Sequence, residues 1–138
     1  MEYKMNNKTN RVNCEDLPLL IETINQHPDL LHLDYTPSVH KLSECGLQAV
    51  MEILPLLDSN DTWERFRAQR VLEGVVQRRY GWKAGQGYPV ESNGEEKVRV
   101  LINEMGNYQA DASKEVRTIS IKKWKNWLQT QMHEDEKK

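Results

Sequence analysis

The sequence predicts an all-α protein, built as a short stack of antiparallel helix hairpins with about five to six helices. Between Thr36 and Tyr80, apolar residues recur at the spacings of amphipathic helices. Breaks at Gly46 and at residues 58–61 divide this stretch into segments of helix length. No segment has a convincing strand pattern, and each hairpin can bury its apolar face only by stacking on another hairpin.

The composition is that of a folded globular domain, because 38% of the 138 residues are hydrophobic and 29% are charged. The formal net charge of -2 gives no bulk attraction to nucleic acid or to an anionic membrane. No apolar run approaches the ~20 residues of a membrane span, and the N-terminus lacks the apolar stretch of a secretory signal. We therefore expect a cytoplasmic protein without membrane association.

The chain is expected to contain one folded domain between two flexible ends. We predict a flexible N-terminal arm over residues 1–13, a helical domain over 14–131 and a flexible charged tail over 132–138. The first helix of the domain is predicted at 15–26, because the residue before Pro28 disfavours the helical region.

The next two helices are predicted from a helix start, a glycine and a proline. Thr36 supplies a capping hydroxyl and Pro37 occupies the first helical position, so a helix is expected to run from there to about Gly46. A second helix is expected over 47–57. Pro55 lies in its second half, where a missing N–H should bend or tighten the helix.

A third helix is predicted from Asp61 to about Tyr80. Asp61 and Glu64 have the spacing of a capping box, with Asp in place of Ser or Thr. Gly74 lies inside this helix, where glycine costs about 1 kcal/mol relative to alanine. Close approach of another backbone at this position would explain why the helix contains a glycine there.

The remaining chain is predicted to contain one long loop and two helices. Residues 81–94 hold four of the seven glycines, and loops of this length in a compact domain are often functional. Helices are expected at 95–105 and 113–131. Trp124 and Trp127 are interpreted as core anchors of the last helix or, alternatively, as a cap on the open end of the stack.

Several short segments are similar to parts of a known helical repeat. They are Thr36-Pro37-Ser38-Val39 with Gly46-Leu47, Ile53-Leu54-Pro55-Leu56-Leu57, Glu64-Arg65 followed by Ala68, Val71 and Leu72, and the Val-Arg pairs Val98-Arg99 and Val116-Arg117. The stretch from Thr36 to about Leu128 resembles small bacterial HEAT-type repeats, including those grouped with phycobilin-lyase-like repeats. This resemblance implies a right-handed α-solenoid with a protein-binding surface, and it implies no particular chemistry.

The third predicted helix is unusually rich in arginine. It carries five of the eight arginines, and Trp63, Arg67, Arg70 and Arg78 fall in one stripe opposite its apolar face. Guanidinium groups suit carboxylates and phosphates, so the stripe is a candidate docking site for an acidic peptide, a phosphorylated group or a nucleic-acid backbone. The alternative is a solvated face whose arginines form salt bridges within the protein.

The glycine-rich loop after this helix is the second candidate. It matches neither the phosphate-binding P-loop nor the dinucleotide-binding pattern, and no strand precedes it. Its aromatic residues either fold back onto the helices or form a contact surface. Because the loop follows the arginine-rich helix, the two could form one surface. The predicted partner-binding residues are Trp63, Arg67, Arg70, Arg78, Trp82, Gln86 and Tyr88.

No catalytic, metal or cofactor site is predicted. His40 and Glu44 lie on one helix face, but they lack the supporting ligands of a metal or catalytic site. Cys45 is interpreted as a small buried residue, with a disulfide to Cys14 as the alternative.

These observations favour a non-catalytic adaptor that binds an acidic or extended segment of another protein. Nucleic-acid binding by the same arginine stripe is the less favoured alternative, and an accessory domain of a larger enzyme is another. Homo-oligomerisation is also considered, because about two repeats are fewer than the three that a free-standing stack usually needs.

Overall fold

The computed structural model describes residues 14–138 of the chain, and the predicted arm at 1–13 lies outside the described residues. The elements in chain order are the 3₁₀ helix η1 (Cys14–Asp16), α2 (Leu17–Glu22), α3 (Pro37–Ser43), α4 (Leu47–Ile53), the 3₁₀ helix η2 (Leu54–Asp58), α5 (Thr62–Arg79), α6 (Gly94–Glu104) and α7 (Lys114–Glu136). Over residues 14–138 there is no strand, only an isolated bridge between Lys83 and Gly87. The all-α prediction is confirmed.

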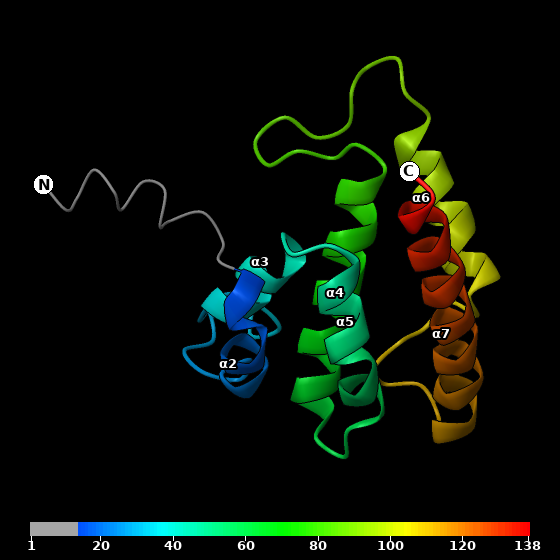
Figure 1. Cartoon of the computed structure of the whole chain (residues 1–138). Helices are drawn as coiled ribbons and strands as arrows, with labels where there is room; N and C mark the ends of the chain where they lie inside the picture. Colours follow the sequence, from blue (N-terminus) through cyan, green and yellow to red (C-terminus); the bar gives the residue numbers. More distant parts are fainter. Residues whose placement is uncertain (1–13) are drawn as a thin grey trace, which may run out of the picture.

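Helix α5 lies at the centre of the molecule, with α2 and α3 on one side and α7 on the other (Figure 1). The core is formed by apolar side chains from α3, α4 and α5, and Leu42, Ile53 and Val71 are fully buried. Helix α7 adds Trp124 and Leu128 to the same core. Burial of these side chains is the main source of stability, at roughly 1.5–3 kcal/mol for each large one.

The predicted helix starts are confirmed by capping hydrogen bonds. Thr36 Oγ1 accepts the Val39 N–H at 3.1 Å, and Asp61 Oδ1 accepts the Trp63 N–H at 2.9 Å. Each cap satisfies a backbone donor that the first turn leaves unpaired, and such caps contribute about 1 kcal/mol each.

Pro55 has the effect expected from its missing N–H. The α-helical hydrogen-bonding pattern of α4 ends at Ile53, and the chain continues as the tighter 3₁₀ helix η2. The last turns of this helix are therefore narrower than the first.

Gly74 marks a close approach between α5 and α3, as expected, but the contacting group is a side chain rather than a backbone. A Cβ atom added at Gly74 would lie 2.5 Å from Ser43 Oγ and 2.7 Å from Ser43 Cβ. Any larger residue would therefore push α3 away from α5.

Two helices differ in length from the prediction. The first α-helix ends at Glu22 rather than near residue 26. The last helix continues to Glu136, so much of the segment 132–138 that was predicted as a flexible tail is helical. Arg79 explains this extension, because its guanidinium bonds Asp135 at 2.8 Å and Gln131 at 3.0 Å.

Cys14 and Cys45 form a disulfide, with their Cα atoms 5.6 Å apart. The interpretation of Cys45 as a buried unpaired residue was wrong, and the alternative pairing is the one observed. Packing of α2 against α3 brings together two cysteines that are 31 residues apart in the chain. Over residues 14–138, no helix combines the length and apolar character needed to cross a membrane.

Candidate functional site

Arg67 and Arg70 of the predicted stripe contact the segment between α2 and α3, whereas Trp63 at the start of the stripe is exposed. Arg67 is only 7% exposed. Its Nε donates to the Leu33 carbonyl at 3.0 Å and its Nη1 to Asn25 Oδ1 at 2.9 Å. The guanidinium also lies over the Trp63 ring, 5.6 Å from the ring centroid. Arg67 therefore holds this segment against α5.

Arg70 has acidic partners within the chain. Its Nε bonds Asp34 Oδ2 at 2.5 Å and its Nη1 bonds Glu73 Oε1 at 2.8 Å. Burial acts to lower the pKa of Arg70, but the hydrogen bonds and charges of these two carboxylates outweigh burial and raise it. The interactions of Arg67 and Arg70 are thus intramolecular, and a direct role in partner binding stays a prediction.

The other predicted residues lie at the opposite end of α5. Arg78 stacks on Trp82, with its guanidinium carbon 4.8 Å from the ring centroid, and its Nη1 donates to the Gly74 carbonyl. Tyr88 is half-buried against the core and Gln86 is exposed. At 1.5 Å per residue, Trp63 and Arg78 are about 22 Å apart along the helix axis. The stripe therefore divides into two groups.

A groove that was not predicted from the sequence lies between the α4–η2 segment and α7. It has a volume of about 490 Å³. Its walls are Met51, Leu54, Pro55 and Asp58 from α4–η2, and Thr118, Ile121, Lys125, Leu128, Gln129 and Met132 from α7. The lining is mostly apolar.

One side of helix α7 lines the groove, and the adjacent side packs into the core. The lining residues recur at spacings of three and four and so lie along one side of the helix. Trp124 lies on the adjacent side, is 1% exposed, and packs edge-to-face against Trp127 at 5.3 Å. Trp124 anchors α7 in the core while Ile121 and Met132 remain in the groove. The core-anchor interpretation of Trp124 is confirmed.

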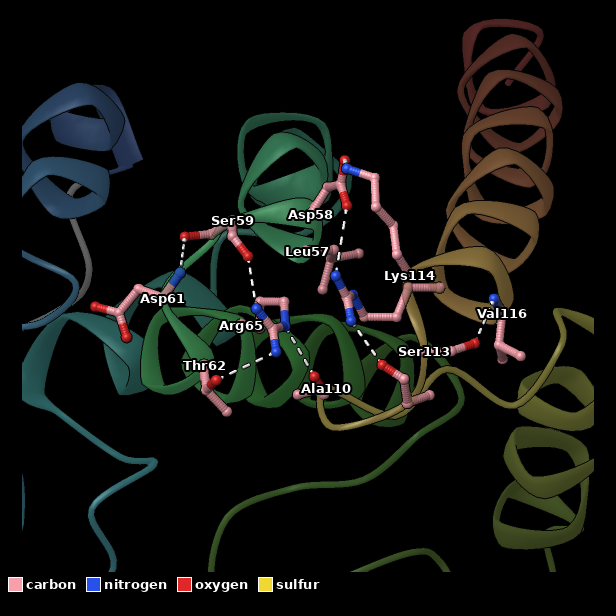
Figure 2. A network of polar contacts seen from close by, with 12 residues as sticks. Leu57, Asp58, Ser59, Asp61, Thr62, Arg65, Ala110, Ser113, Lys114 and Val116 are labelled. Carbon is pink, nitrogen blue, oxygen red and sulfur yellow. Dashed lines mark hydrogen bonds and ion pairs between the residues drawn. The ribbon is translucent and has the colours of Figure 1, made fainter.

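A network of polar contacts fixes one end of the groove (Figure 2). Arg65 on α5 donates to the Ser59 carbonyl at 2.7 Å and to the Ala110 carbonyl at 2.8 Å. Tyr108 donates its hydroxyl to the Leu57 carbonyl at 2.5 Å. These bonds attach the segment that precedes α7 to η2 and to the turn that follows it. Asp58, which belongs to the groove lining, lies next to these bonds in the same network.

The charges around the groove are not balanced. Asp58, the carboxylate of the lining, lies 3.7 Å from Lys114 Nζ and 3.9 Å from Arg117 Nη2. Lys125 makes no hydrogen bond or ion pair with any residue in the described part of the chain. The lining of the groove is thus mostly apolar and includes one cation, Lys125, that has no partner among residues 14–138.

The structure gives no sign of a metal centre in residues 14–138, where no group of three or more His, Cys, Asp or Glu side chains is placed to hold an ion. His40 stacks on Tyr35, with ring centroids 5.1 Å apart.

Comparison with known proteins adds no functional information, since no family model, curated protein or solved structure matches the chain. The resemblance to HEAT-type repeats accordingly stays an interpretation of the sequence.

Proposed function

We propose that the protein is a non-catalytic interaction module that binds an acidic segment of another protein, with apolar side chains of that segment seated in the groove between α4–η2 and α7. The observation that carries this proposal is the apolar groove of about 490 Å³, whose lining includes Lys125, a cation without a partner among residues 14–138. The acidic partner is the one expected from the sequence, but the binding surface is the groove instead of the arginine stripe.

The shape and composition of the groove suit an amphipathic segment. From Thr118 to Met132 the α7 wall is about 21 Å long, which matches about four turns of a helical ligand. Met51 and Met132 line the groove, and their flexible, polarisable side chains can adapt to different apolar groups. An acidic flank on the ligand would pair with Lys125 and increase the rate of association.

Nucleic-acid binding by the arginine stripe has weaker support, because Arg67 and Arg70 already bond groups within the chain. The HEAT-type arrangement is retained as a proposal. It is supported by the contacts of α5 with both α3 and α4, and by the proline-tightened end of the α4–η2 segment. The Cys14–Cys45 disulfide argues against the expected cytoplasmic location, because disulfides persist mainly in oxidising compartments.

The binding proposal can be tested with a pair of labelled peptides of about 16 residues, long enough for four helical turns. Both carry leucines at helical spacing, and the remaining positions are glutamate in one peptide and lysine in the other. Fluorescence anisotropy should show at least about tenfold tighter binding of the acidic peptide, equivalent to about 1.4 kcal/mol.

Two single substitutions on α7 serve as variant and control. Lys125→Glu reverses the charge on the groove lining and should weaken binding of the acidic peptide by about fivefold or more. Lys123→Glu makes the same change two residues away, outside the groove lining, and should leave binding nearly unchanged. Equal binding of the two peptides, or equal effects of the two substitutions, would contradict the proposal.

A further inference from the structure

The charges of the chain are segregated between its N-terminal segment and α7. Residues 14–35 contain five Asp or Glu residues and no Lys or Arg. Residues 114–125, the first half of α7, contain five Lys or Arg residues and one Glu. Two surfaces of opposite charge attract one another at distances up to about a Debye length.

The acidic segment also exposes large apolar side chains. Leu30 is 90% exposed and Leu31 is 85% exposed, and both lie in the turn between α2 and α3. We call residues 29–33 the leucine turn. Adjacent leucines with this exposure on a folded surface are typical of a contact site, because burial would remove their apolar surface from water.

The leucine turn is held in one conformation. Asp29 Oδ1 accepts the Leu31 N–H at 2.8 Å, and the Tyr35 carbonyl accepts the Asp29 N–H at 2.9 Å. Arg67 also holds the turn, because its Nε donates to the Leu33 carbonyl. A turn fixed in this way loses little conformational entropy when its leucines enter a pocket.

We infer that the groove between α4–η2 and α7 binds the leucine turn of a second copy of this chain. The inference rests on the proposed function and names the ligand of the same groove. The turn supplies two projecting apolar side chains on an acidic segment, and the groove supplies an apolar space beside the basic half of α7. Both the shape and the charge of the two surfaces are complementary.

The contact is intermolecular and head-to-tail. In Figure 1 the segment that contains the leucine turn lies on one side of α4 and α5, and α7 lies on the other. A chain cannot fill its own groove across these helices. Each added copy therefore leaves one turn and one groove available, so the assembly grows as an open chain or closes into a ring.

Sedimentation velocity over a concentration series tests the self-association. At low ionic strength the average mass should rise with concentration, and added salt should lower it because the surfaces are oppositely charged. The double substitution Leu30→Asp with Leu31→Asp should give a monomer, and so should Ile121→Glu in the groove. Val90→Asp is the matched control, because Val90 is 99% exposed but lies in the loop between α5 and α6.

Mixing the two variants tests the head-to-tail geometry. The turn variant keeps an intact groove and the groove variant keeps an intact turn, so an equimolar mixture should form dimers and nothing larger. If turns instead met turns, the groove variant would dimerise on its own and the turn variant would stay monomeric in the mixture, and the inference would be overturned. Circular dichroism checks that each variant is folded, and Lys125→Glu replaces Ile121→Glu if the latter is not.

The outcomes separate this inference from the proposed function. A chain that stays monomeric at all concentrations while it binds the acidic peptide through Lys125 contradicts self-association alone. A chain whose self-association depends on Leu30 and Leu31 but not on the groove substitutions contradicts the inference as well. Binding of the peptide that is insensitive to Lys125→Glu contradicts the groove as the proposed binding site.

Discussion

Helices α5 and α7 both carry rows of cations, but their surroundings differ. The cations of α5 are all arginines, and Arg65 and Arg67 bond backbone carbonyls of neighbouring segments. The cations in the middle of α7 are lysines, and Lys122 and Lys125 are exposed without partners in the described part of the chain. A planar guanidinium with five donors can satisfy several buried acceptors, whereas a strongly hydrated ammonium stays in water.

The comparison shows that cation-rich helices can have opposite roles. On α5 the positive charge stabilises the covering segment, and on α7 it remains available to a ligand. The number of charges along a helix does not separate these two roles. The type of cation is more informative, because arginines bond buried acceptors and lysines stay in water.

Among the changes considered, removal of the Cys14–Cys45 disulfide should most strongly destabilise the segment between α2 and α3 that covers α5. The Cys14–Cys45 bond closes a loop of about 31 residues that includes the segment over Arg67 and Arg70. Loss of such a cross-link should lower the free energy of unfolding by about 3–4 kcal/mol. Urea unfolding with and without reductant measures this difference. The double variant Cys14→Ser with Cys45→Ser should not respond to reductant.

Substitution of Arg67 by alanine should destabilise the protein by about 2 kcal/mol, because the Leu33 carbonyl and Asn25 lose their donor. On α7, Lys123→Ala should change stability by less than about 0.5 kcal/mol, since Lys123 is exposed. Chemical denaturation measures both values. Similar effects at the two sites would remove the distinction drawn between the helices.

The smallest effect is expected from the bond that anchors the segment before α7. Tyr108→Phe removes the hydrogen bond to the Leu57 carbonyl and should cost about 1 kcal/mol at neutral pH. Burial raises the pKa of Tyr108 to about 12 from its ordinary value of 10.0. The unfolded chain therefore loses this proton at lower pH than the folded chain does.

The sign of the pH effect follows from this difference. The stabilisation from the protonated hydroxyl is fully present below pH 10 and is lost as the pH rises from 10 to about 12. Thermal unfolding across this range should therefore show a steeper decline for the unmodified protein than for Tyr108→Phe. Burial also raises the pKa of Tyr35, so the variant should keep part of the decline.

The local features of the fold could be predicted from the sequence. Thr36 and Asp61 cap helices because their side chains reach backbone groups two or three residues away. Pro55 tightens its own helix for an equally local reason. These effects depend on neighbours in the chain, so their positions can be read from the sequence.

The candidate site could not be predicted in the same way. Arg67 has partners 34 and 42 residues away, and Arg65 has one 45 residues away. The sequence indicated cations on one helix face, but the segment that covers them comes from another part of the fold. The groove was missed for a similar reason, since Met51 and Ile121 line it from helices far apart in the chain.

The sequence by itself determined the helical class, the helix starts and the segregation of acidic and basic residues, because these follow from residue spacing and composition. Only the tertiary structure decided whether the two cysteines pair, which cations are bonded internally and which apolar face stays open. Those outcomes depend on how α2 packs on α3 and α4, how α3 packs on α5, and how α7 packs on α4 and η2. This packing brings together groups that have no relationship along the chain.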